Sequence, residues 1–107
     1  MSEDERFRAL ANPTRRRLLR IVRDDARTVG DLASSVGASQ PATSQHLGVL
    51  REAGLVSVEQ RGRCRLYRAD HAALREAQRF FEDYWSKNLD VLADVAERRA
   101  ARRSAAS

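Results

Sequence analysis

The sequence predicts a mainly α-helical fold with one small β-hairpin, in the order of four helices, two strands and a last helix. Three observations lead to this prediction. Apolar residues recur every three or four positions through most of the chain, which is typical of amphipathic helices. A Gly-Ala-Ser break at 37–39 separates two short helical patterns. Val56 and Val58 alternate with polar residues before a turn at Gly62, and a second strand pattern follows it.

The first two predicted helices meet at an Asn-Pro pair. Residues 3–10 carry acidic side chains at their start, where they favour a helix N-terminus. Pro13 ends this helix and fits the first turn of the next one, with Asn12 as its N-cap. Leu18 and Val22 belong to an apolar stripe, and arginines cover the other sides of the second helix.

The third and fourth helices are expected at 28–36 and 39–53. Thr28 and the acidic residue three positions later have the spacing of a capping box. Gly37 is placed to end the third helix in a left-handed conformation, and Ser39 to cap the fourth. Two short helices joined by so tight a turn form a helix-turn-helix.

The strands are expected at 55–59 and 65–69, around a turn at 61–64. A helix-turn-helix followed by such a hairpin, or wing, is a winged helix-turn-helix, a fold that delivers one helix and one β-ribbon to duplex DNA.

The apolar spacing then predicts a long helix over 70–99. We therefore expect one domain, 1–99, that combines DNA binding and dimerisation, and a flexible basic tail, 100–107.

Composition limits the possible functions. The chain has 107 residues, of which 42% are hydrophobic and 33% charged, and its net charge of +5 suits a polyanionic partner. The sequence shows no Ser/His/Asp set, phosphate loop or paired acids, so we expect no enzyme and no cofactor. It lacks an apolar run of 18 residues and has a polar, acidic start, which predicts a cytoplasmic protein without a membrane span or signal peptide. One cysteine, Cys64, allows no intrachain disulfide.

A helical wheel divides the fourth helix into two faces. Thr43, Leu47 and Leu50 cluster on the side that must meet the core. The opposite side presents short polar groups near the helix N-terminus, where glutamine can pair with adenine and serine with base edges or phosphate. Thr43 is expected to lie mostly in the core, with its hydroxyl free for a local bond. The predicted DNA-binding residues of this helix are Ser39, Gln40, Thr43, Ser44, Gln45 and Arg51. Read alone, these are ordinary surface residues.

The hairpin carries Arg61, Arg63 and Arg65 around its turn. Their alternation predicts that all three lie on one side of the ribbon, spaced for phosphates or a minor groove. A guanidinium can bind phosphate with two parallel hydrogen bonds. The alternative is a charged hairpin tip that only aids solubility.

The segments LANPTRRRLLRIV, DLA with ASQPATSQHLGVLREAGLV, and RGRCRLYR together resemble the ArsR-type (ArsR/SmtB) family of bacterial winged-helix repressors. The resemblance implies a homodimer through the first and last helices, a DNA operator blocked to transcription, and release by an inducer whose identity the sequence does not give. In this chain, residues 29–32 hold no thiol, and Asp70-His71 has no second ligand a turn or two onward. The chain therefore resembles the subgroup of this family that lacks recognised metal ligands. No metal site is therefore expected.

Aromatic and apolar residues of the first and last helices are expected to form the dimer core, although a ligand pocket is an alternative for the aromatic cluster. These residues are Phe7, Phe80, Phe81, Tyr84, Trp85, Leu89 and Leu92. Two further readings keep the same fold: a metal- or thiol-responsive sensor, in which Cys64 is a redox switch rather than a small strand hydrophobe, and a winged helix used only for protein–protein contact.

Overall fold

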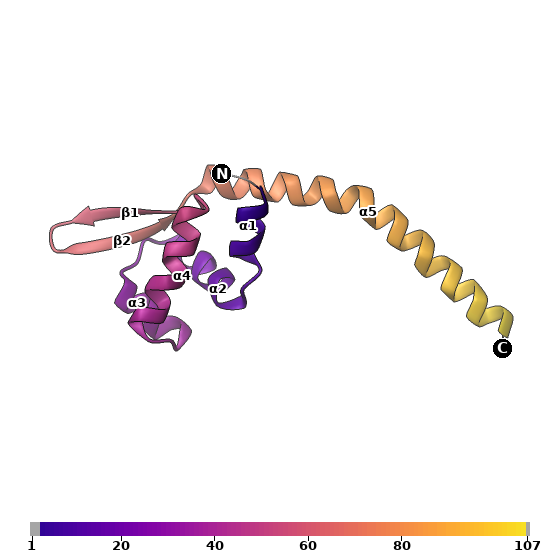
Figure 1. Ribbon diagram of the computed structural model, residues 1–107, viewed down its shortest axis with the longest axis horizontal. Coiled ribbons are helices and arrows are strands. Elements are labelled where there is room, and N and C mark those ends of the chain that lie inside the picture. The colour runs from indigo at the N-terminus through magenta and orange to yellow at the C-terminus, as the bar shows by residue number, and fades with distance from the viewer. Residues whose placement is uncertain (1–2, 107) are drawn as a thin grey trace. The chain divides into compact units, whose positions relative to one another are not determined.

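A computed structural model describes the backbone of residues 3–106 and the side chains of 3–83, 86 and 95–103. Five helices and two strands follow one another in the predicted order along this described part (Figure 1). They are α1 (Glu3–Leu10), α2 (Pro13–Asp24), α3 (Val29–Val36), α4 (Gln40–Glu52), β1 (Val56–Arg61), β2 (Cys64–Ala69) and α5 (His71–Ala106). The chain divides into two compact units, 1–77 and 78–107.

The core of the first unit gathers one buried face from each of its elements. Leu18 of α2, Leu32 of α3 and Leu47 of α4 are fully buried, and Leu55 before β1 joins them. Tyr67 of β2 closes the cluster on the hairpin side. Burial of each large aliphatic side chain contributes about 1.5–3 kcal/mol, so this cluster is the main source of stability for the helix-turn-helix.

The start of α2 has the predicted cap. Asn12 Oδ1 accepts hydrogen bonds from the backbone N–H groups of Thr14 and Arg15, at 2.9 and 3.1 Å, and Pro13 occupies the first turn. These bonds satisfy two N–H groups that the helix itself leaves without partners.

An Asn12→Ala variant is expected to lose about 0.5–2 kcal/mol of folding free energy, because both N–H groups lose their acceptor. Asn12→Asp keeps a carboxylate oxygen there and should unfold close to the parent. Urea unfolding measures both variants. An aspartate variant as unstable as the alanine variant would argue against the cap.

The turn of the helix-turn-helix is also as predicted. Thr28 and Ser39 cap α3 and α4 through side-chain oxygens that accept from Asp31 N–H and Ala42 N–H, each at 3.2 Å. Gly37 ends α3 with a φ of +66°, a left-handed conformation that costs an L side chain about 1–2 kcal/mol. The chain can therefore reverse between the two helices within three residues.

The hairpin is longer than expected. Arg61 pairs with Cys64, so the turn contains only Gly62 and Arg63, and both strands extend to it. Figure 1 shows the turn at the free end of the hairpin, away from the helices. At its base, Tyr67 exchanges backbone hydrogen bonds of 2.7 and 3.0 Å with Arg27, in a bridge that the sequence did not predict. The bridge ties β2 to the segment between α2 and α3.

Helix α5 continues to Ala106, beyond the expected end at 99. Alanine and arginine fill most of the added segment, and both are strong helix formers, which favours continuation of the helix. Within the described residues, no helix is both long enough and apolar enough to cross a membrane.

Candidate nucleic-acid interface

Helix α4 has the two faces that the wheel predicted. Its buried residues are Thr43, Leu47 and Leu50, whose spacing places them on one side of the helix. Ser44 and Gln45 on the other side are exposed, and so are Gln40, Pro41 and Gly48. The buried face fixes the rotation of the helix about its axis. Its polar half near the N-terminus therefore points to solvent.

Gln40 lies at this polar end, close to α3. Its Nε2 atom is 3.5 Å from the place that a Cβ of Gly30 would occupy, which is an ordinary van der Waals distance. Ser39 uses its hydroxyl oxygen as the N-cap acceptor, which leaves its O–H free to donate. Residues 30 and 40 come close only in the folded chain, so their nearness was not predicted from the sequence.

Thr43 was predicted to be one of the DNA-binding residues of this helix, and the structure contradicts this prediction. Its side chain is fully buried, and its hydroxyl donates a 2.8 Å hydrogen bond to the carbonyl oxygen of Ser39. The local bond that the sequence suggested is therefore present, but the side chain cannot reach DNA. It stabilises the first turn of α4 instead.

Arg51 lies at the other end of α4 and is exposed. It lies eleven positions after Gln40, about 16 Å farther along the helix axis. A DNA contact of Arg51 would therefore be to a part of the DNA backbone distant from the groove that the N-terminal half of α4 enters.

The hairpin arginines do not share one face of the ribbon. The prediction that all three lie on one side is therefore wrong. Residues that pair directly across two antiparallel strands lie on the same face of the ribbon. Arg61 pairs with Cys64 and Gln60 with Arg65, so Arg61 and Arg65 lie on opposite faces. The two-residue turn causes this result, because odd positions of β1 pair with even positions of β2.

Arg61 is engaged with an acid on its own face. Its Nε donates to Glu59 Oε1 at 3.2 Å, and Arg68 Nη2 donates to Glu59 Oε2 at 3.4 Å. Glu59 thus joins neighbouring arginines of both strands. Arg68 was not predicted from the sequence, because its contact with Glu59 depends on strand register.

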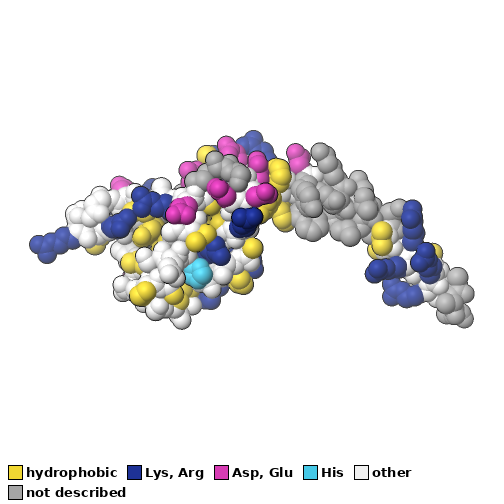
Figure 2. All heavy atoms as spheres, in the orientation of Figure 1, with side chains coloured by type: hydrophobic (Ala, Val, Ile, Leu, Met, Phe, Trp, Pro, Cys, Tyr) yellow, Lys and Arg dark blue, Asp and Glu magenta, His cyan; other side chains and the backbone are white. Residues whose placement is uncertain are grey.

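Arg63 and Arg65 are exposed, and neither has an ion-pair partner among the described residues. Figure 2 shows basic side chains at the free end of the hairpin, while acidic side chains gather elsewhere on the same unit. Acids of α1 contribute to that separation, since Glu3 and Asp4 lie in its first turn. The tip is therefore the place on the hairpin where unpaired positive charge can meet a phosphate.

The predicted dimer residues are only partly described. Phe7 of α1 is half-buried, whereas Phe80 and Phe81 of α5 are 40% and 48% exposed. The side chains of four others lie outside the described residues: Tyr84, Trp85, Leu89 and Leu92. Two large exposed aromatic residues in succession are unusual on a surface that stays in water.

Cys64 is a free, exposed thiol beside the hairpin turn. Within the described residues, no three His, Cys, Asp or Glu side chains are grouped so that they could share a metal ion.

A helix-turn-helix with a polar outer face, followed by a hairpin with arginines at its tip, defines the class of winged helix-turn-helix DNA-binding proteins. Comparison with known proteins extends this result to a family. Residues 12–58 match the family described as bacterial regulatory protein, arsR family. The HTH-type transcriptional regulator Rv2034 of Mycobacterium tuberculosis is 33% identical over 96 residues, which cover 90% of each chain. The chain belongs to the ArsR family and is a DNA-binding transcriptional regulator rather than an enzyme.

Two further similarities bear on how such proteins work. The transcriptional repressor SdpR of Bacillus subtilis is 28% identical over 81 residues, covering 76% of this chain and 90% of that one. The structure is also similar, with a TM-score of 0.65 and 25% identity, to the homodimeric winged helix-turn-helix DNA-binding domain of a possible ArsR-family regulator from Mycobacterium bovis. That match covers 85% of this chain and 77% of the other.

Proposed function

We propose that the chain is a homodimeric repressor that binds a pseudo-palindromic operator in cytoplasmic DNA. The outer face of α4 carries the proposal. Its buried face fixes the helix so that Ser44 and Gln45 point outward near the N-terminus, the end that enters the major groove in helix-turn-helix proteins. The hairpin tip supplies a second, basic contact surface in the same unit.

We assign different tasks to the two surfaces. Gln40, Ser44 and Gln45 read base edges, because their amide and hydroxyl groups match donors and acceptors of the major groove. Arg63 and Arg65 bind backbone phosphates, which carry affinity but little sequence information. We assign supporting backbone contacts to three more residues: Ser39, Arg51 and Arg61.

We infer dimerisation through α1 and α5. The exposure of Phe80 and Phe81 supports it, as does the homodimeric relative from Mycobacterium bovis. A two-fold dimer presents two copies of α4, so its half-sites should lie about 34 Å apart, or a multiple of that distance. A bound dimer then blocks transcription from the DNA it covers, which is consistent with the name of the Bacillus subtilis relative as a repressor.

Footprinting on the DNA around the protein's own gene tests the function directly. We expect protection of a two-fold symmetric sequence and lower expression of a reporter placed behind it. Absence of any salt-sensitive complex with duplex DNA would contradict the proposal and favour a winged helix used only for protein contact.

The role of Gln45 can be tested by a variant. Gln45→Ala is expected to lose about 1–3 kcal/mol per half-site on the operator, or roughly 5- to 150-fold in affinity, because its base-edge hydrogen bonds disappear. Binding to random DNA should hardly change. Titration of both DNAs by fluorescence anisotropy measures the difference.

Thr43→Val is a control on the same helix, since it removes a hydroxyl that faces Ser39 and not solvent. It should leave both affinities unchanged at temperatures where the variant is folded. Equal losses on operator and random DNA for the Gln45 variant would contradict base reading.

A further inference from the structure

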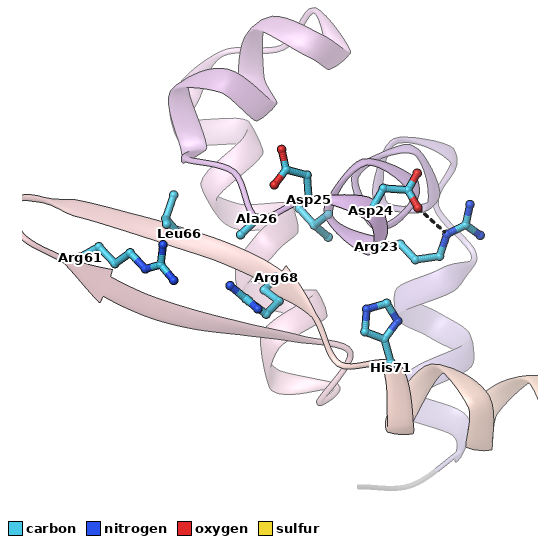
Figure 3. A pocket seen from close by; sticks show the side chains of 9 residues that line it. Arg23, Asp24, Asp25, Ala26, Arg61, Leu66, Arg68 and His71 are labelled. Atoms are coloured by element: carbon cyan, nitrogen blue, oxygen red, sulfur yellow. Dashed lines mark ion pairs between the residues drawn. The ribbon is translucent and has the colours of Figure 1, made fainter.

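A hollow of about 280 Å³ lies where three elements of the first unit meet (Figure 3). Its walls come from the end of α2 and the two residues after it, the outer face of the hairpin and the first residue of α5. The polar lining consists of Arg23, Asp24, Asp25, Arg61, Arg68 and His71, and the apolar lining of Val22, Ala26 and Leu66. None of these residues has been given a role in base reading.

The hairpin wall presents two guanidinium groups side by side. Arg61 and Arg68 lie on the same face because strand pairing places Ser57 opposite Arg68 and Arg61 opposite Cys64. Both bind Glu59, yet each guanidinium has five N–H donors and uses few of them there. The three side chains are 47% to 63% exposed, and ion pairs so exposed contribute little to stability. The arginines can therefore exchange Glu59 for another anion.

The opposite wall adds donors and already neutralises its own acids. Arg23 pairs with Asp24 at 3.5 Å, and Arg27 pairs with Asp25 at 3.6 Å. His71 is the first residue of α5 and lines the hollow on that side, where a ring N–H can donate (Figure 3). The hollow itself is lined by three arginines and two aspartates. With the ion-pair partners behind the lining, Arg27 and Glu59, the set holds four arginines and three carboxylates, so one positive charge remains for a ligand.

We propose that this hollow binds a small organic anion, a carboxylate or phosphate monoester with a short apolar body. The guanidinium forks of Arg61 and Arg68 match the geometry of either oxyanion. The volume lies just below the usual range for small-molecule sites and suits a ligand of a few carbon atoms beside Leu66.

Occupation of the hollow should also weaken DNA binding, a consequence that rests on the proposed function. The ligand holds Arg61 on the face away from Arg65 and fixes the hairpin against α2 and the start of α5. A wing held in this way loses one phosphate contact and its freedom to adjust to the DNA backbone. The small anion would then be the class of molecule that releases the repressor.

Binding can be measured on the full chain with benzoate, phenyl phosphate and inorganic phosphate as probes. Thermal unfolding and calorimetric titration are run against chloride at the same ionic strength. We expect at least one organic anion to raise the Tm and to bind with a 1:1 ratio per chain. Arg68→Gln should weaken this binding about tenfold or more, because it removes charge-assisted hydrogen bonds.

Two further variants make the test specific. Glu59→Gln should tighten anion binding, since the internal competitor for both guanidiniums loses its charge. Arg17→Gln removes an exposed arginine of α2 that does not line the hollow, and it should change nothing. The proposal is overturned if no probe stabilises the chain more than chloride, or if the Arg17 and Arg68 variants lose binding equally.

A DNA titration with and without the bound probe separates this proposal from the proposed function. Anion binding without any DNA binding would leave the hollow as a site and contradict the repressor. Operator binding by a chain that no probe stabilises would support the repressor and contradict the hollow as a ligand site. Stabilisation by inorganic phosphate alone would show that the hollow takes a free phosphate or a DNA phosphate, and it would overturn the organic ligand.

Discussion

In a Leu47→Ala variant, the free energy of unfolding is expected to be about 2–5 kcal/mol lower than in the parent chain. Leu47 is fully buried in the middle of α4 and belongs to the cluster that holds α2, α3 and the hairpin together. Shortening it removes buried methyl groups and leaves a cavity that the surrounding helices only partly fill. For a domain of this size, the loss corresponds to a fall in Tm of at least about 8 °C.

Val49 provides the matched control, because it lies on the same helix but is 40% exposed. Val49→Ala should shift the free energy of unfolding by no more than about 0.5 kcal/mol. Chemical unfolding followed by far-ultraviolet circular dichroism measures both. Similar losses for the two variants would mean that α4 is not fixed by its buried face.

The consequence for DNA binding follows from the same packing. Leu47 sets the rotation of α4 and therefore the direction of Ser44 and Gln45. Below its lowered Tm, the Leu47 variant should bind operator more weakly while its weak binding to random DNA persists, since the hairpin arginines are not on this helix. Stability and base reading are thus linked through one buried side chain.

Local signals explain why so much of α4 could be predicted. A cap needs a side chain of the right type at the right place, and Ser39 provides it. A left-handed turn needs a glycine, and Gly37 is there. Helical spacing alone then separates Leu47 from Gln45. None of these inferences depends on which distant residues meet.

The hairpin shows where such reasoning ends. Which arginines share a face depends on strand register, and the pairing of Arg61 with Cys64 and of Gln60 with Arg65 places Arg61 and Arg65 on opposite faces. The pairing of Glu59 with Arg68, and the bridge between Arg27 and Tyr67, also join positions that only the folded chain brings together. Alternation in sequence therefore predicted the charge of the wing but not its direction.

An Arg63→Gln/Arg65→Gln double variant should lose affinity for operator and random DNA by the same factor. The logarithm of the binding constant falls with the logarithm of salt concentration by about 0.9 for each phosphate that the protein neutralises. Removing two such contacts per chain should reduce the slope by about 1.8, or about 3.6 for a dimer, if both arginines contact phosphates. Titrations at several salt concentrations give the slope.

Arg61→Gln is the informative comparison, because its effect should be smaller than that of Arg63→Gln. Arg61 has an acidic partner, Glu59, at 3.2 Å, so its charge is partly neutralised in the free protein. Arg63 has no such partner among the described residues. Gln45→Ala should leave the salt slope unchanged while it lowers operator affinity. A double variant with an unchanged slope would place the hairpin tip away from the phosphates, and affinity would then have to come from the α4 side of the molecule.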